Sequence, residues 1–274
     1  MKNLLRSCAL AFSCFSRVPM PQVAWTEDAL RTMLCFFPLV GIVIGVAEWA
    51  WLALCGALGF SPALVGAGLA LVPALVTGGI HLDGFCDVVD AQASHAEPAR
   101  KREILKDSHV GAFAVIGVAG YLLMYAALGA DAVQLADAPA HGVAALAAAC
   151  VPACLLGCGH VQARCLSGLA TAVFPKNAGR GMLAAFHDAA GKRAVPVTLA
   201  VEYVVAVGIA CVLSREIGIV MAVCGLVSLG ALHRFARRQF GGMSGDLAGW
   251  FLQVAELAML AGAVVCLHVM QGGL

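Results

Sequence analysis

Three aspartates at the end of a long apolar stretch have the spacing expected of a metal-binding face. Asp83, Asp87 and Asp90 are four and then three positions apart, so a helix would place their carboxylates on one side. Like charges held that closely repel one another. A divalent cation such as Mg²⁺, which prefers carboxylates together with substrate phosphates, removes the repulsion. The spacing alone also fits a solvated helix that begins with acidic residues because they suit the helix dipole.

A basic segment follows these aspartates and ends near residue 113. Arg102 and Lys106 carry positive charges that could clamp a phosphate group. Asp107 could add a ligand, and His109 is a candidate proton acceptor. Basic residues also anchor the cytoplasmic ends of membrane spans, and each residue taken singly favours that interpretation. Next to three carboxylates, the segment predicts a phosphate site.

The glycine-rich residues 240–246 are the third candidate segment. Gly241 and Gly242 permit close backbone approach and expose N–H donors to an anion, and Ser244 follows them. Asp246 could join the metal cluster of the three earlier aspartates. The segment therefore predicts a second part of the same phosphate and metal site.

These segments must be positioned by helices that cross a membrane. The 274 residues are 61% hydrophobic and only 12% charged, with a mean hydropathy of +0.90, whereas soluble domains are about 25% charged. The apolar residues come in blocks long enough for spans of about 20 residues. We therefore predict an all-α fold, in which residues 1–274 form a single polytopic integral membrane domain of about seven transmembrane helices.

The flanking segments have different roles in this prediction. Residues 1–21 predict an amphipathic helix that lies on the membrane surface and ends at two prolines. Residues 165–174 are apolar but too short to cross, so we expect a buried or interfacial segment. The spans are expected at about 33–57, 62–80, 110–130, 140–159, 195–213, 217–233 and 247–269.

The basic residues indicate the orientation of these spans. With the N-terminus in the cytoplasm, sixteen of the 17 Lys and Arg residues lie inside and only Arg215 lies outside, so we expect an N-inside, C-outside topology. Segments 81–109, 160–194 and 234–246 then share the cytoplasmic side, and the predicted site faces the cytoplasm.

The sequence gives little indication of macromolecular partners. The net charge of +1 does not indicate a surface for binding nucleic acid. Gly41 and Gly45 form a Gly-x-x-x-Gly pair that could mediate helix packing, as in a homo-oligomer.

Together these segments resemble the cobalamin synthase family, also called adenosylcobinamide-GDP ribazoletransferases or cobalamin-5′-phosphate synthases. The most specific pieces are the string His-Leu-Asp-Gly-x-x-Asp-x-x-Asp from His81 and the string Lys-Asp-Ser-x-Val-Gly-x-Phe from Lys106. One departure is Ser244, which stands where threonine is usual. The matching pieces, in the expected order, are residues 15–21, 37–41, 78–90, 106–113, 164–174 and 241–246, with Glu256.

The resemblance implies the last assembly step of vitamin B12. The ribose 3′-hydroxyl of α-ribazole, or of its 5′-phosphate, attacks the cobinamide-side phosphorus of adenosylcobinamide-GDP, and GMP leaves. The family requires Mg²⁺ and resides in the bacterial cytoplasmic (inner) membrane, so the lipid bilayer is an expected partner. The expected assignments are metal binding by Asp83, Asp87, Asp90 and Asp246, phosphate binding by Arg102, Lys106, Gly241, Gly242 and Ser244, and catalysis by His109, His81 and Asp107.

Two other functions remain open at this point. A membrane phosphotransferase of the CDP-alcohol type would also use acidic residues at the end of a span, but its motif usually contains an Ala-Arg pair, whereas Cys86 is followed here by Asp87. A small-solute transporter would use the intramembrane acids Glu48, Glu202 and Glu256. Transporters usually show internal repeats, and we find no convincing repeat between the two halves.

Overall fold

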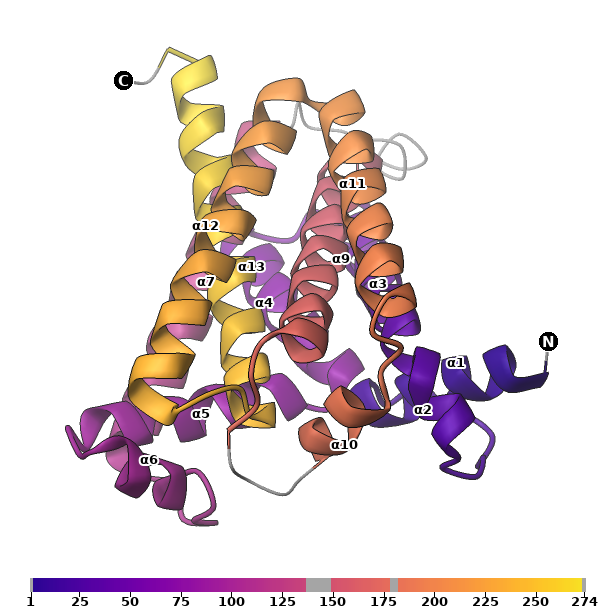
Figure 1. The fold of residues 1–274 in the computed structure, drawn as a ribbon. Helices are drawn as coiled ribbons and strands as arrows, with labels where there is room; N and C mark the ends of the chain where they lie inside the picture. The colour runs from indigo at the N-terminus through magenta and orange to yellow at the C-terminus, as the bar shows by residue number, and fades with distance from the viewer. Residues whose placement is uncertain (1, 137–148, 178–181, 273–274) are drawn as a thin grey trace.

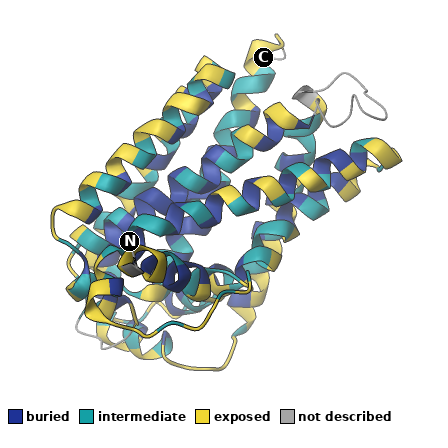
Figure 2. Ribbon diagram, turned by 90° about the vertical axis from the view of Figure 1, so that its right-hand side faces the viewer, coloured by how far each residue is buried: buried dark blue, intermediate teal, exposed yellow. Residues whose placement is uncertain are grey.

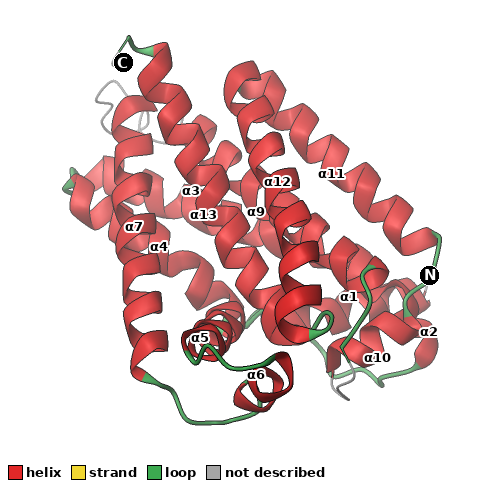
Figure 3. Cartoon of the chain, turned by 60° about the vertical axis from the view of Figure 1, so that its left-hand side comes forward, coloured by secondary structure: helices red, strands yellow, loops and turns green. Residues whose placement is uncertain are grey.

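A computed structural model describes residues 2–136, 149–177 and 182–272 of the chain. The described residues form helices joined by loops, as Figure 3 shows, and the all-α prediction is confirmed. The elements are α1 (Lys2–Phe15), α2 (Glu27–Met33), η1 (Leu34–Phe36), α3 (Phe37–Leu58), α4 (Pro62–Thr77), α5 (Ile80–Ala93), α6 (Pro98–Ile104), α7 (Ala112–Ala136), α9 (Cys150–Val173), α10 (Met182–Ala189), α11 (Ala194–Leu213), α12 (Arg215–Phe240) and α13 (Gly245–Met270).

Long helices form a bundle, and the short ones gather at one of its ends (Figure 1). Within the bundle α9 packs against α3 and α11, while α13 packs against α12 and α5. The short helices α1, α2, α5, α6 and α10 lie at the end of the bundle opposite the C-terminus. Buried residues follow the middle of the bundle and exposed residues its outer faces (Figure 2). Many of the exposed residues are apolar, such as Val212 at 87%, and such faces suit contact with lipid.

Five described stretches are long and apolar enough to cross a membrane. They are Glu27–Leu58, Ala112–Gln134, Ala194–Leu213, Arg215–Phe240 and Gly245–Met270. Four of them contain a predicted span whole, and Ala112–Gln134 overlaps the span predicted at 110–130 but begins two residues later. The pair α4 and α5 would give a sixth crossing if it counted as one bent span. The total of seven stays a prediction, partly because residues 140–148 of one predicted span lie outside the described residues.

The span predicted at 62–80 ends earlier than expected. Helix α4 stops at Thr77, and the chain turns by 101° into α5. Gly78 and Gly79 have φ angles of +69° and +79°, a left-handed conformation that glycine adopts without steric cost. The turn separates α5 from α4, and it makes the helix that carries Asp83, Asp87 and Asp90 a separate element.

Residues 160–173 differ more strongly from the prediction. The sequence suggested a span at 140–159 and a separate short segment at 165–174, but the structure has the single helix α9 across this region, and the predicted break is wrong. His160 and Arg164 mark no membrane edge because both are buried and paired inside the bundle. A charged side chain whose partner lies on another helix does not have to reach water.

The glycine pair in α3 packs helices within the chain. A Cβ at Gly41 would lie 2.8 Å from the carbonyl carbon of His160, and one at Gly45 would lie 2.8 Å from the Cα of Gly157. The two glycines therefore let the backbones of α3 and α9 approach closely.

The first helix, α1, packs one of its faces against the rest of the protein. Its residues Leu10 and Ala11 are buried, whereas Leu5 is exposed. Helix α1 ends at Phe15, before the two prolines that were expected to end it.

Candidate active site

A cavity of about 600 Å³ opens at the end of the bundle where the short helices gather. Its walls come from α1, α5, α6, α9, α10 and α13, together with the loops after α9 and α12. Segments that are far apart in the sequence therefore meet here, as the sequence predicted. The predicted site residues that line the cavity are His81, Asp83, Arg102, Lys106, Ser244 and Asp246.

Helices α5 and α13 cross at small residues, and this crossing brings two of the aspartates together. A Cβ at Gly84 would lie 2.8 Å from the Cα of Asp246, and one at Gly249 would lie 3.0 Å from the carbonyl oxygen of His81. Ser244 begins α13, because its hydroxyl oxygen accepts a hydrogen bond from the backbone N–H of Leu247. Asp246 therefore sits in the first turn of α13, directly over α5.

We expect Gly84→Ala to disturb this crossing. The added methyl group would meet the backbone of α13, which cannot move aside as a flexible side chain can, so Asp83 and Asp246 would be displaced relative to each other. Catalytic activity at this site should fall at least about ten-fold, since a misplacement near 1 Å already costs far more in some enzymes. The matched control is Gly120→Ala, whose methyl group meets no atom within 4 Å. Equal activity of the two variants would contradict the tight crossing.

The acidic residues influence one another electrostatically. Burial, followed by the negative charges of Asp246, Asp83 and Asp90, raises the pKa of Asp87 to about 6. The four predicted metal ligands therefore form one electrostatic cluster. Within the described part of the chain, no three His, Cys, Asp or Glu side chains are gathered closely enough to hold a metal by themselves.

Asp90 has a second role that the sequence did not reveal. Its two carboxylate oxygens accept hydrogen bonds from the backbone N–H groups of Gly111 at 2.6 Å and Ala114 at 2.8 Å. These groups belong to the start of α7, where N–H groups lack partners in their own helix. Asp90 thus caps α7 and joins it to α5. It remains a candidate ligand because each carboxylate oxygen has a further lone pair.

A second cavity, of about 340 Å³, lies further along α5. Asp87 and Asp90 line it, together with Asp107 and His109. The Nδ1 atom of His109 lies 2.7 Å from Oδ1 of Asp107, and the same oxygen accepts the backbone N–H of His109 at 3.0 Å. Hydrogen bonds from the ring and then the backbone of His109 lower the pKa of Asp107. The His109 side chain is 90% exposed, so its other ring nitrogen is open to a substrate.

The position of Arg102, a predicted phosphate-binding residue, is fixed by its hydrogen bond to the backbone of Phe240 and by its buried neighbour Lys101. Arg102 donates from Nη1 to the carbonyl oxygen of Phe240 at 3.2 Å, and Gly241 next to it has a φ of +72°. Lys101, the neighbour of Arg102, is buried and donates to the side-chain oxygens of Gln92 at 3.0 Å and Gln239 at 2.6 Å. These bonds tie α6 to α5 and α12, and so fix the direction of Arg102.

His81 lies in the cavity wall but is nearly covered. It is 6% exposed. Its ring stacks on that of Phe15 with the centroids 6.3 Å apart, and the ring of Phe37 is tilted against it at a centroid distance of 5.8 Å. Burial, followed by the positive charge of Arg164, lowers the pKa of His81 to about 3. The ring is therefore neutral near pH 7 and a weak proton acceptor. Of the two predicted histidines, His109 is better placed for acid–base chemistry.

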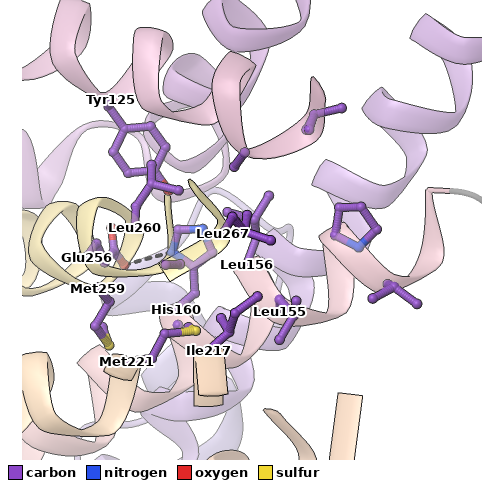
Figure 4. Close-up of a pocket in the computed structure, with 16 residues that line it drawn as sticks. Tyr125, Leu155, Leu156, His160, Ile217, Met221, Glu256, Met259, Leu260 and Leu267 are labelled. Carbon is purple, nitrogen blue, oxygen red and sulfur yellow. Dashed lines mark hydrogen bonds and ion pairs between the residues drawn. The ribbon is translucent and has the colours of Figure 1, made fainter. Parts of the chain in front are cut away.

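A buried ionic network beyond the cavity joins α3, α9 and α13. The ring nitrogens of His160 lie 2.9 Å from Oε1 of Glu48 and 2.8 Å from Oε1 of Glu256, and Arg164 donates to the same Glu256 oxygen at 2.7 Å. All four side chains are buried. Figure 4 shows Glu256 and His160 side by side at the edge of a small, mostly apolar cavity of about 70 Å³. Glu48 and Glu256 therefore join helices inside the bundle. Their position in the interior is explained by this pairing without assuming that they carry a transported solute.

Comparison with known proteins identifies relatives along almost the whole chain. A profile of the family described as cobalamin-5-phosphate synthase matches residues 7–264. The adenosylcobinamide-GDP ribazoletransferase of Lachnoclostridium phytofermentans is 35% identical, over 95% of this chain and 93% of the relative. Those of Desulfitobacterium hafniense and Geobacillus kaustophilus are 31% and 29% identical, over 96% and 98% of this chain and 98% of each relative. No solved structure matches.

Proposed function

Because this chain belongs to the cobalamin-5-phosphate synthase family, whose ribazoletransferase activity assembles the nucleotide loop of cobalamin, we propose that the transfer takes place along the acidic face of α5. The substrates we propose are adenosylcobinamide-GDP and α-ribazole or its 5′-phosphate. The larger cavity receives the diphosphate, and the ribose hydroxyl of the acceptor approaches from the side of His109.

One observation carries this proposal. Asp83 and Asp246 line the same cavity as Arg102 and Lys106, although the four residues come from three separate regions of the sequence. Carboxylates and basic side chains facing one space are the groups that a metal-bound diphosphate needs, because it presents both a cation and excess negative charge. Phosphoryl transfer depends mostly on positioning and on neutralising charge, and these residues can do both.

The acidic cluster fits Mg²⁺ in the form in which proteins usually hold it. One or two carboxylates with several waters and substrate phosphates complete its coordination, so a preformed cage of three side chains is not needed. Burial and the repulsion between carboxylates together raise the pKa of Asp87, and a cation at Asp83, Asp87 and Asp246 would relieve the repulsion. When bound, Mg²⁺ would offset negative charge on the diphosphate oxygens.

The chain's own residues can then carry the transfer. The acceptor's ribose oxygen forms a bond to the cobinamide-side phosphorus, and the bond from that phosphorus to the oxygen of GMP breaks. His109 accepts the hydroxyl proton, and Asp107 holds the ring in position and balances its positive charge. Arg102 and Lys106 stabilise the charge on the departing GMP. The product is a phosphodiester between the corrinoid side and α-ribazole.

We expect His109→Gln to lower kcat by about 10²-fold to 10⁴-fold, the usual contribution of a general base. Asp107→Asn should have a smaller effect, because His109 remains present but is less well oriented. Initial rates of GMP release by the two variants and by the wild type would measure both effects. The control is His95→Gln, which alters a histidine outside both cavities. Wild-type kcat in His109→Gln would exclude this histidine as the base.

The direct test of the function uses the purified protein in liposomes with adenosylcobinamide-GDP and α-ribazole. We expect one GMP for each phosphodiester formed, no reaction after EDTA treatment, and recovery on addition of Mg²⁺. Product formation at the full rate in EDTA would refute the role of Mg²⁺. Failure to release GMP under all conditions would refute the proposed reaction.

We further propose a bacterial cytoplasmic membrane location, with seven crossings and the site-bearing end in the cytoplasm. The distribution of basic residues supports this orientation, since Arg102, Lys106 and Lys176 all lie at that end. An alkaline phosphatase fused to the C-terminus should then be active outside the cytoplasm. Activity of a cytoplasmic reporter at that position would reverse the orientation.

A further inference from the structure

The larger cavity contains a third cation that the proposed reaction has not used. Lys176 lines the cavity together with Arg102 and Lys106, but it comes from the loop after α9 and not from the basic segment around α6. The side chains of Ser244 and Asp246 line the same cavity. Lys176 therefore adds a positive charge from a different direction to the space that we assign to the diphosphate.

The backbone at Lys176 is fixed to the start of α13. Met243 donates its N–H to the carbonyl oxygen of Pro175 at 2.9 Å, and Asn177 donates its N–H to the carbonyl oxygen of Met243 at 3.0 Å. Gly242, directly before Met243, has a φ of +143°, and a Cβ there would lie 2.6 Å from the carbonyl carbon of Lys176. Residues 175–177 are thus joined by hydrogen bonds to the segment that leads into Ser244 and Asp246.

The ammonium group of Lys176 forms an ion pair with Asp188 of α10. The pair is accessible, with 34% of the Lys176 side chain and 61% of the Asp188 side chain exposed. Exposed pairs of this kind contribute little to stability, because water competes for both groups. A diphosphate offers more charge and more acceptor oxygens than a single carboxylate, so it can take the place of Asp188.

We propose that Lys176 binds the diphosphate of the nucleotide substrate and that Asp188 is its counter-ion until the substrate arrives. This inference rests on the proposed function, since it concerns the diphosphate of the same site. The diphosphate belongs to the nucleotide substrate and is absent from the acceptor nucleoside. Removal of the lysine therefore affects the two substrates differently.

The first test is a kinetic comparison of Lys176→Met with the wild type. The KM for adenosylcobinamide-GDP should rise about ten-fold to 100-fold, the usual effect of losing a hydrogen bond to a charged group. The KM for α-ribazole should stay within about two-fold, and Lys176→Arg should recover most of the loss because it keeps the charge. Asp188→Asn should leave the KM for adenosylcobinamide-GDP unchanged or lower it. The matched control is Lys192→Met, which removes an exposed lysine outside the described cavities.

A second test does not depend on turnover. GDP in the presence of Mg²⁺ is titrated calorimetrically into the wild type, Lys176→Met and Lys192→Met. Weaker GDP binding in Lys176→Met alone would support the inference, even if the wild type transferred no ribazole. The absence of ribazole transfer would refute only the proposed function. Equal GDP binding by all three proteins would refute the inference even if the transferase were active. An equal rise in both KM values in Lys176→Met would also refute it, since it would indicate a general loss of structure.

Discussion

Asp83→Asn is expected to lower the rate of ribazole transfer by about 100-fold or more without unfolding the protein. Asparagine keeps the shape of the side chain but loses the charge that a divalent ion needs. Even the mutation of groups that only support metal ligands lowers metal affinity or activity by about 10-fold to 100-fold. Asp87→Asn should give a loss of the same kind. Both variants should insert into the membrane normally, because neither residue holds helices together in the way that Asp90 does.

The stability of these variants makes the test sharper. The pKa of Asp87 is raised to about 6, so its ionised form is less favourable in the folded chain than in the unfolded chain. Above pH 6 this charge therefore lowers stability, and Asp87→Asn should leave the thermal midpoint unchanged or raise it. Loss of activity with a normal or higher midpoint is the expected result. The control is Asp28→Asn, an exposed aspartate in the first turn of α2. Near-full activity of Asp83→Asn would remove Asp83 from the metal site.

Glu256→Gln is expected to cause the largest loss of stability. The carboxylate pairs with both His160 and Arg164 in the bundle interior, and its side chain is only 2% exposed. Breaking a buried ion pair on one side leaves an uncompensated charge, which typically costs about 3–5 kcal/mol. For a chain of this size the thermal midpoint should fall by roughly 10 °C. Thermal unfolding in detergent micelles would measure the shift.

Two further variants separate the ionic network from a general effect of the substitution. Glu216→Gln changes an exposed glutamate in the first turn of α12 and should leave the midpoint nearly unchanged. Adding Arg164→Met to Glu256→Gln should restore part of the stability, because the buried charge without a partner is then also removed. A shift below about 2 °C for Glu256→Gln alone would mean that the network does not hold α9 to α13.

Much of the site was predictable from local spacing. The intervals between Asp83, Asp87 and Asp90 predicted a shared helix face, and α5 contains all three. Arg102 and Lys106 were predicted beside them because the segment is short and basic, and both line the cavity with Asp83. The five apolar stretches agree with predicted spans because the length and hydropathy that a helix needs to cross a bilayer are both local properties of the sequence.

The remaining features depend on partners that are distant in the sequence. Asp90 caps a helix whose N–H groups lie 21 and 24 positions further along, and no local pattern indicates such a contact. In the sequence Arg164 marks the end of an apolar stretch and so suggested the end of a span. Its partner Glu256 is 92 positions away, and only the folded chain brings the two together. The glycines of α5 and α13 show their purpose only at the crossing of the two helices.

The division of the site into two cavities was also not predictable. The sequence placed Asp107 and His109 with the other candidates, whereas the structure places them beside Asp87 and Asp90, in the smaller cavity. Asp83 and Asp246 line the larger one. The direction in which each side chain of α5 points depends on how α6 and α13 pack over that helix, and this packing is tertiary information.

Binding of Mn²⁺, followed by electron paramagnetic resonance of the purified protein, tests the metal-binding role of the acidic face most directly. We predict one Mn²⁺ ion bound per chain, displaced by Mg²⁺, held more tightly when GDP is present, and lost in the Asp83→Asn/Asp246→Asn double variant. Equal Mn²⁺ binding by the wild type and the double variant, with or without GDP, would contradict the account.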